Sequence, residues 1–471
     1  MKQTPLLIAF LFTFLHDYAQ TLIPPAVDKR IEMMSMVARL SEYEEYSSKD
    51  AAEYVNAIHS WFDKYKTDTL IGFAQRVREE SSIGFDAVMS MAINLKFVKD
   101  KFTLQPNWKT DLDKRWKPEQ AAHLLTLLNQ FYTRTNAAGF FAQEEPYYQK
   151  VIAAFGQVLT NFNQSWYFDY YGVKPKDKFT IVIGCGNGGG NYGPGISLDK
   201  NTREVYAIMG SWSFDDKGNP VFKEANYLPT VVHEFNHSFI NPLLNRYDTS
   251  VVLKTSMQKI LDTMRSEMQR QAYGDWKTVI NESLVRASVV RYLSFNNPTN
   301  PKIAEDELSI QINRGFLWTK DLVALLGTYE ANRKKYPTIN EFYPVIISFF
   351  KSVADSISYS KAIYESNLPR VASLEPFSNN AQDVDPSITE LTINFDQVLT
   401  GKGYSINLGK LGNDGFPIKS VIGYANNNQS LKVKVELKPD TEYEFVLTGR
   451  SFKNTGGYPL KDYTIKFRTK K

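Results

Sequence analysis

Residues 231–240 carry the sequence VVHEFNHSFI. Its apolar positions, 231, 232, 235, 239 and 240, recur with the period of an α-helix and predict one buried face. His233 and His237 stand four positions apart, so a helix brings both imidazoles to the same side. The pair Asn241-Pro242 follows and predicts the end of this helix.

The spacing His-Glu-x-x-His is typical of a metal site. Two imidazoles one turn apart can bind one ion, and Glu234 beside them can reach a water on that ion. Zn²⁺ in a catalytic site takes about three protein ligands and leaves one position for water. We therefore predict His233 and His237 as zinc ligands and Glu234 as the general base. The alternative is a solvated helix face that carries two histidines.

The third ligand is expected downstream, at Glu282 in TVINESLVRA, residues 278–287. Apolar neighbours predict a partly buried helix, and a buried carboxylate needs a partner. One alternative is an ion pair with Arg286 at i+4. Both interpretations can hold, because Arg286 or Asn281 can orient a ligand without touching the metal. Two other histidines, His59 and His123, are interpreted as packed or surface residues.

Outward from these stretches, the pattern predicts an α+β chain. Helical periodicity dominates residues 28–170 and 228–360. The helices expected before the first strand are 31–40, 51–65, 69–78, 85–97, 117–131 and 144–162. Strands are predicted at 179–183 and 205–212, which form a small sheet between the two helical parts. Thr338 and Glu341 form a predicted capping box at one helix start.

A glycine-rich loop, residues 184–195, formally matches Gly-x-Gly-x-x-Gly after a strand. A dinucleotide site would next need a helix, which residues 190–195 cannot continue. We expect a flexible loop near a cleft, leading to a strand that can pair with an extended peptide. The alternative is a plain connection between strands. Cys185 has no neighbouring histidine and is not predicted to be a nucleophile.

The C-terminal part is predicted to be all-β. Alternating apolar residues over 388–395, 431–435, 443–447 and 463–467 indicate short strands separated by turns. About 95 residues of this pattern are typical of a β-sandwich. A boundary rich in proline and polar residues falls near 367–380. The predicted domains are a signal peptide at 1–19, a zinc metallopeptidase-like domain at 20–368 with a helical part to about 175, and a sandwich at 374–471.

The composition indicates an exported protein. Lys2 precedes an apolar run of about ten residues, which is too short to span a membrane. The 471 residues carry a net charge of +4, too balanced for nucleic-acid binding. A single cysteine excludes an internal disulfide, which favours a bacterial source and a periplasmic or extracellular location. Asn281-Glu282-Ser283 is a formal glycosylation acceptor, and a glycan there would block the predicted site.

His233-Glu234-x-x-His237 followed by Asn281-Glu282 resembles the gluzincin metallopeptidases. The resemblance implies His233, His237 and Glu282 as zinc ligands and Glu234 as the base. Gluzincins also use a tyrosine or histidine to stabilise the oxyanion. The tyrosines considered for that role here are Tyr192, Tyr247 and Tyr292.

A closer resemblance, over roughly residues 25–365, is to an uncharacterised family of exported bacterial proteins. It rests on RIEMMS at 30–35, GFDAVMS at 84–90, Asn191-Tyr192-Gly193, and the stretches 233–242 and 282–287. The C-terminal part resembles bacterial immunoglobulin-like domains in DVDP at 383–386, Asn394-Phe395 and LKPDTEY at 437–443.

The sequence therefore predicts a secreted zinc peptidase acting on a peptide or protein substrate. Two alternatives stay open. One is a cell-surface or periplasmic binding protein with a vestigial metal site. The other is a zinc hydrolase acting on another amide or on a glycopeptide.

Overall fold

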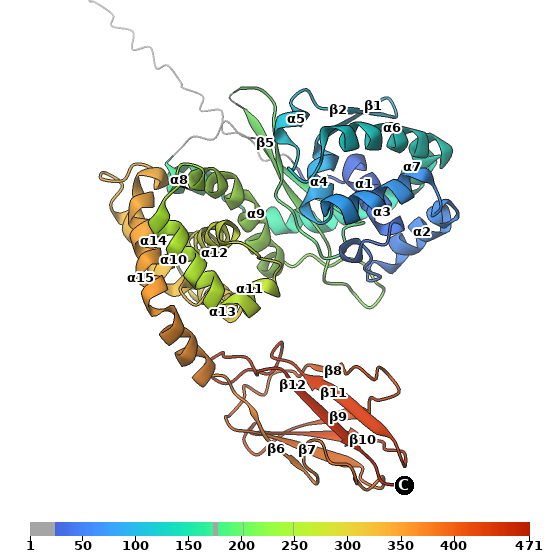
Figure 1. The fold of residues 1–471 in the computed structure, drawn as a ribbon, viewed down its shortest axis with the longest axis vertical. Coiled ribbons are helices and arrows are strands. Elements are labelled where there is room, and N and C mark those ends of the chain that lie inside the picture. The colour runs from blue at the N-terminus through green and yellow to red at the C-terminus, as the bar shows by residue number, and fades with distance from the viewer. Residues whose placement is uncertain (1–23, 173–177, 201, 248) are drawn as a thin grey trace, which may run out of the picture. The chain divides into compact units, whose positions relative to one another are not determined.

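The computed structural model describes residues 24–172, 178–200, 202–247 and 249–471 (Figure 1). The predicted signal peptide at 1–19 lies outside these ranges. The chain forms two compact units, Met1–Pro242 with Pro337–Ile339 and Leu243–Tyr336 with Asn340–Lys471. Fifteen α-helices and four small sheets occur among the described residues. The predicted mixed α+β class is therefore confirmed.

The first unit packs helices around a small sheet. Helix α1 contacts α3 and α4, and α3 contacts α6, in the group drawn in blue to teal in Figure 1. Its helices are α1 Lys29–Leu40, α2 Ala52–Phe62, α3 Thr69–Ser81, α4 Asp86–Ile93, α5 Trp108–Asp111, α6 Pro118–Arg134, α7 Ala137–Gly156, α8 Ser165–Tyr171 and α9 Glu224–Leu244. Its strands are β1 Leu95–Val98, β2 Lys101–Leu104, β3 Lys178–Ile183, β4 Gly195–Ser197 and β5 Arg203–Met209.

Three predicted helix boundaries are wrong. The helix expected over 85–97 ends at Ile93, because the chain turns into the β1–β2 hairpin through Lys99 and Asp100, both at positive φ. The helix expected over 144–162 is α7, which starts earlier, at Ala137, and stops at Gly156. Helix α9 continues past Asn241-Pro242 to Leu244, because a proline removes a single backbone donor without forcing the chain to stop there.

The small sheet has the order β3-β5-β4, with β3 parallel and β4 antiparallel to β5. Because β5 is central, both of its edges are already paired. The prediction that residues 205–212 pair with an extended peptide is therefore wrong, and β4 forms the edge on that side. Residues 184–194 lead from β3 to β4 without a helix, as expected for a loop that is not a dinucleotide site.

A buried carboxylate anchors the first half of that loop. Glu32 of α1 is fully buried and accepts the N–H groups of Cys185 at 2.7 Å and Gly186 at 3.2 Å. Tyr54 donates its hydroxyl to the same carboxylate at 2.7 Å. Burial raises the pKa of Glu32 to about 7, although these three donors act to lower it. The expected flexible loop is thus fixed to α1 at its start.

The second unit combines helices with two antiparallel sheets. Its helices are α10 Val251–Thr263, α11 Arg265–Gln269, α12 Trp276–Asn296, α13 Lys302–Asn313, α14 Thr319–Ala331 and α15 Ile339–Ser366. Helix α12 packs against α10, α13 and α14 and is buried on most of its surface. Among the described residues, every helix is too short or too polar to cross a membrane.

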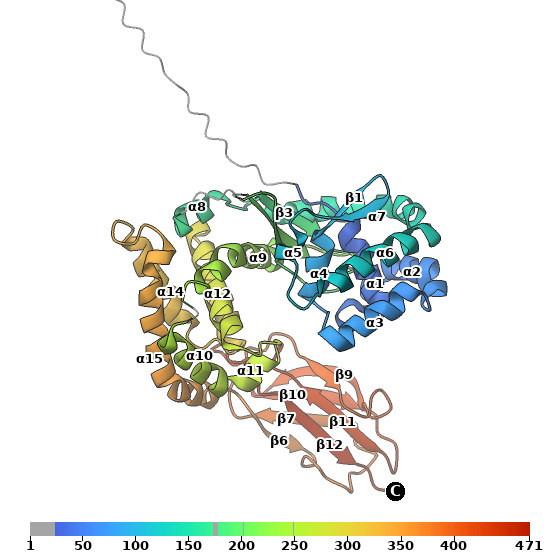
Figure 2. The same cartoon turned by 45° about the horizontal axis from the view of Figure 1, so that its top comes forward.

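The two sheets of the second unit are drawn in orange to red in Figure 2. Side chains from both sheets form one apolar core. Their strand orders are β6-β7-β10-β9 and β12-β11-β8. In β10, Leu431, Val433 and Val435 are buried whereas the intervening lysines are exposed, as the alternation predicted. The strands are β6 Val371–Glu375, β7 Glu390–Phe395, β8 Ile406–Leu408, β9 Ile418–Ala425, β10 Ser430–Val435, β11 Glu442–Leu447 and β12 Tyr463–Arg468.

The raised pKa of Glu32 predicts a pH-dependent stability. The folded chain binds a proton at Glu32 up to about pH 7, whereas the unfolded chain releases it near its ordinary value of 4.5. This contribution is therefore complete below pH 4.5 and is lost as the pH rises to about 7, on the order of 3 kcal/mol in all. Urea unfolding of the wild type and Glu32→Gln at pH 4.5, 6 and 7.5 measures it. We expect a less negative slope of stability against pH in the variant, and equal slopes would contradict a neutral Glu32.

Candidate metal centre

Aromatic packing holds helix α9 in a fixed rotation. Phe235 is fully buried, and its ring lies 4.6 Å from that of Phe179 on β3, centroid to centroid. Phe239 stacks on Tyr171 of α8 at 4.5 Å. Asn236, also fully buried, accepts a hydrogen bond from the Tyr171 hydroxyl at 2.9 Å. With this face buried, the two histidines emerge on another face and stay half-buried.

The two imidazoles converge. Nε2 of His233 lies 3.2 Å from Nε2 of His237. Nδ1 of His237 lies 3.1 Å from Oδ1 of Asn241, one turn further along α9. An amide oxygen only accepts, so this contact puts the His237 proton on Nδ1 and leaves the lone pair of Nε2 for a ligand. The sequence assigned Asn241 only to the helix end, and this orienting role was missed.

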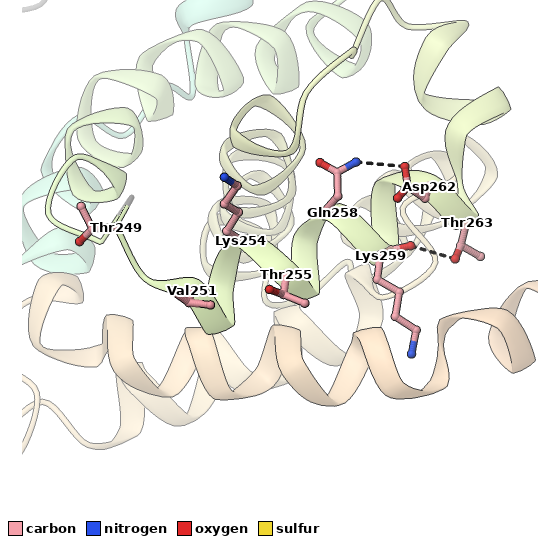
Figure 3. Close-up of a pocket in the computed structure, with 8 residues that line it drawn as sticks. All are labelled: Thr249, Val251, Lys254, Thr255, Gln258, Lys259, Asp262 and Thr263. Carbon is pink, nitrogen blue, oxygen red and sulfur yellow. Dashed lines mark hydrogen bonds between the residues drawn. The ribbon is translucent and has the colours of Figure 1, made fainter.

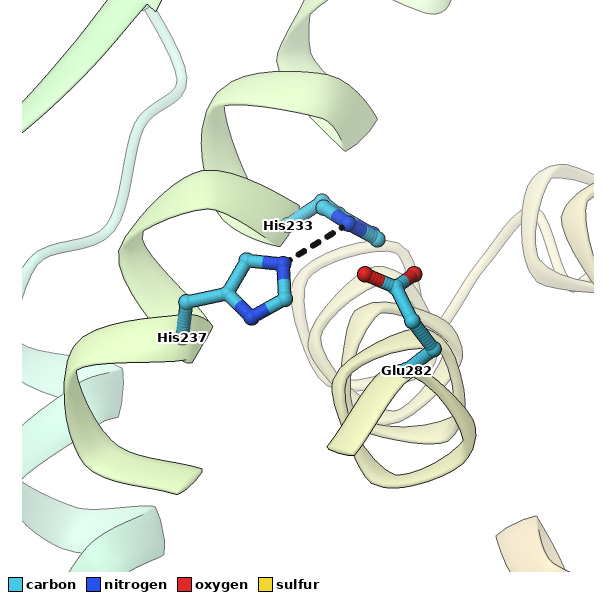
Figure 4. A group of neighbouring side chains, drawn as sticks. All are labelled: His233, His237 and Glu282. Atoms are coloured by element: carbon cyan, nitrogen blue, oxygen red, sulfur yellow. Dashed lines mark hydrogen bonds between the residues drawn. The ribbon is translucent and has the colours of Figure 1, made fainter. Parts of the chain in front are cut away.

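Glu282 joins the histidines. One carboxylate oxygen of Glu282 and one nitrogen of each histidine all lie within 4.8 Å of one another (Figure 4). The residue sits in the second turn of α12, which starts where Asp275 accepts the N–H groups of Lys277 and Thr278. The predicted helical placement of Glu282 is thus confirmed. The three predicted ligand residues come together although Glu282 lies 45 positions beyond His237 in the chain.

The donor set fits a zinc ion. Two nitrogens bound tetrahedrally at ordinary Zn–N distances are about 3.3 Å apart. The observed 3.2 Å between the two Nε2 atoms agrees with that separation. Two imidazoles and one carboxylate are also a ligand set that catalytic zinc sites use, with one position left for water. These residues can therefore hold the metal without rearrangement of the histidine pair.

Arg286 compensates the negative charge of the Glu282 carboxylate. Its guanidinium is nearly fully buried and lies 2.9 Å from Oε2 of Glu282. It also donates to the Tyr273 hydroxyl at 2.8 Å and to Oε1 of Gln311 at 2.5 Å. The predicted ion pair is confirmed, and it coexists with the proximity of Glu282 to the histidines. Tyr273 and Gln311 could not be found from sequence, because neither lies at helical spacing from Glu282.

Glu234 points away from the apolar face and is confined by the edge of the sheet. Its side chain is only 8% exposed. A methyl group placed on Gly193 would lie 2.7 Å from Oε2 of Glu234 and 3.1 Å from its carbonyl oxygen. Only a glycine permits this approach, so the chain just before β4 closes one side of the carboxylate.

The three tyrosines considered for oxyanion stabilisation differ in their surroundings. Tyr247 donates its hydroxyl to the carbonyl of Asn340 at 3.1 Å. Tyr292 is fully buried. Tyr192 precedes Gly193, and burial together with the charges of Glu45, Asp86 and Glu234 raises its pKa to about 12, against a lowering contact with Tyr46. The charge of Glu234 is thus one of those that act on Tyr192.

The remaining candidates carry no comparable arrangement. His59 lies on the surface beside Asp63, and the ring of His123 packs edge-on against Phe73 at 4.9 Å, as predicted. Burial raises the pKa of the Cys185 thiol well above its usual value, which excludes an activated nucleophile. Oδ1 of Asn281 is buried without a hydrogen-bond partner among the described residues. A bond to the Glu282 carboxylate would need the amide nitrogen instead, so the orienting role considered for Asn281 stays a prediction.

A surface hollow of about 1050 Å³ runs along α10 (Figure 3). It is lined by residues between Thr249 and Thr263 only. Gln258 donates to Asp262 there at 3.0 Å. The residues that line the hollow include lysines, threonines and one aspartate that accepts a hydrogen bond from Gln258. They include no histidine or glutamate, unlike the cluster of His233, His237 and Glu282.

Comparison with known proteins identifies one family. Residues 23–349 match the family described as "Domain of unknown function (DUF4932)". No curated protein matches. Solved structures that match include surface layer protein SbsC, domains 1–6, at 16% identity and a TM-score of 0.17, over 55% of this chain and 35% of that one. The N-terminal part of the bacterial S-layer protein SbsC matches at 13% identity and a TM-score of 0.17, over 86% of this chain and 78% of that one.

The chain thus spans about a third of the first of these structures. The family match takes in well over half of the chain, including His233, Glu234, His237 and Glu282. The protein belongs to the DUF4932 family.

Proposed function

We propose that this protein is an exported, zinc-dependent peptidase. The observation that carries the proposal is the convergence of His233, His237 and Glu282 within 4.8 Å. Glu234 lies on the same helical turn as the two histidines. A structural zinc site normally closes all four positions with protein ligands. Three ligands favour a site that keeps a position for water, and hence an enzyme over a binding protein with a vestigial site.

The residues divide the chemistry among them. When bound, zinc polarises the substrate carbonyl and lowers the pKa of water to about 7. Glu234 accepts the proton of the attacking water and passes it to the leaving amine. Asn241 holds the tautomer of His237, and Arg286 fixes the Glu282 carboxylate. Gly193 keeps the Glu234 carboxylate in place and excludes water from one of its sides.

Two finer proposals accompany this function. The N-terminal apolar run supports export to the periplasm or the cell exterior. The two antiparallel sheets with a common core support an immunoglobulin-like sandwich in residues 374–471.

Metal analysis tests the ligand set. We expect about one zinc per wild-type chain and loss of most of it in His237→Ala and in Glu282→Ala, since each removes one of three ligands. His123→Ala is the matched control, because that exposed imidazole packs against Phe73 and is not part of the ligand group. Elemental analysis of the four purified proteins measures this. Zinc retained by Glu282→Ala would contradict the third ligand, and its absence from the wild type would favour the binding-protein alternative.

Glu234→Gln separates binding of the metal from turnover. The amide keeps the size of the side chain but cannot accept the proton of the water. We expect unchanged zinc content and a fall in peptide hydrolysis of about 10²- to 10⁴-fold. Cleavage of a mixed peptide library, with and without a chelator, provides the assay. Wild-type rates in this variant would rule out Glu234 as the base.

Gly193→Ala tests the confinement of the base. The added methyl group meets the Glu234 carboxylate at 2.7 Å and must displace it. A displacement of about 1 Å can lower turnover by about 100-fold. We expect that loss with zinc content unchanged. Gly156→Ala is the control, since nothing lies within 4 Å of its added methyl group. Equal activity of both variants would show that the contact is not needed.

A further inference from the structure

Phe85 occupies a backbone position that suits glycine. The N–H of Ala87 donates to the carbonyl of Gly84 at 3.0 Å, which closes a turn with Phe85 as its first central residue. Phe85 has φ 49° and ψ −124°. These angles are those of a type II′ turn, whose first central residue is usually glycine because a Cβ is strained there. The fold therefore carries a strained aromatic residue where glycine would be relaxed.

Burial of the Phe85 side chain does not offset the free-energy cost of this strained backbone. The Phe85 side chain is 49% exposed, whereas most phenylalanines and tyrosines of the first unit are buried. The backbone is instead held by its neighbours. Glu45 accepts the Phe85 N–H at 2.9 Å, and the Tyr46 hydroxyl donates to the Phe85 carbonyl at 2.8 Å. Arg78 fixes Glu45 in turn with two hydrogen bonds. Strained residues that the surrounding structure holds in place cluster at functional sites. The exposed Phe85 side chain is therefore a candidate for contact with a ligand.

The turn is connected to the proposed catalytic base. Tyr46 stacks on Tyr192, with ring centroids 6.1 Å apart and planes 19° from parallel. Tyr192 is followed by Gly193, which lies against the Glu234 carboxylate. The Phe85 backbone carbonyl, through the Tyr46 hydroxyl, thus belongs to a series of contacts that ends at Glu234, and all of its members lie in the first unit.

We propose that Phe85 is a substrate-contact residue that binds an apolar side chain of the peptide. This inference rests on the proposed peptidase function. A half-exposed phenyl gains by covering an aromatic or aliphatic side chain, because both surfaces leave water. The substrate class is therefore a peptide with phenylalanine, leucine or methionine near the cleaved bond.

Thermal unfolding of the wild type, Phe85→Gly and Phe85→Ala tests the strain. Phe85→Gly relieves it, and we expect the Tm to rise by about 2 °C or more. Phe85→Ala keeps a Cβ at positive φ and should give no such rise. A fall in the Tm of Phe85→Gly would show that the phenyl stabilises the fold, and would overturn the inference.

Cleavage of a mixed peptide library by the same three proteins tests the contact, with the residues flanking each cut read by mass spectrometry. In both variants we expect the preference for apolar over small polar residues at one position to fall about tenfold. Binding of one preferred peptide to Glu234→Gln, with and without Phe85→Ala, gives a readout without turnover, and we expect about tenfold weaker binding. Cleavage with unchanged preference would overturn the contact alone. A wild type that holds zinc but cuts no peptide would overturn the proposed function and this inference with it.

Discussion

The rotation of α9 about its axis is the constraint on which the metal centre depends. Two imidazole nitrogens 3.2 Å apart converge on one position, and the rotation of the helix sets the direction in which both point. Side chains such as Val231, Val232 and Phe235 set that rotation, and each contributes about 1.5–3 kcal/mol by burial. Histidines contribute little to such packing. Burial of the apolar face therefore supplies the free energy that fixes the rotation of α9. The histidines on the other face take the positions that this rotation gives them.

Buried carboxylates are stabilised in two different ways. Glu282 faces a guanidinium, so its charge is compensated while it stays available to a metal. Glu32 faces a hydroxyl and two amides, which do not offset its burial, and its pKa rises to about 7. The first arrangement suits a ligand that must be anionic. The second suits an anchor, because two of its three hydrogen bonds tie α1 to the loop that leads to Gly193 and the third, from Tyr54, ties it to α2.

The features predictable from sequence are those with local spacing. The i, i+4 pairs His233–His237 and Glu282–Arg286 follow from helical geometry alone, and the alternation in β10 follows from the period of a strand. Tyr273, Gln311 and the anchor at Glu32 were not predictable. Tyr273 and Gln311 lie 13 and 25 positions from their partner Arg286, and Glu32 lies more than 150 positions from Cys185 and Gly186. The β1–β2 hairpin was missed for another reason. Its strands follow directly on α4, which is apolar on most sides, so periodicity could not separate helix from strand.

Gly193 and Phe85 of the first unit depart from local preference in opposite ways. At Gly193 a side chain would strike Glu234, so the smallest residue is required by the site. At Phe85 a glycine would relax the turn, yet a large side chain is present and half exposed. Neither choice is explained by stability alone, and a chain of ring and backbone contacts through Tyr46 and Tyr192 links the two positions. Deviations from local preference are expected where function opposes stability. Their connection through one series of contacts to the Glu234 carboxylate argues that this part of the first unit is shaped around a substrate.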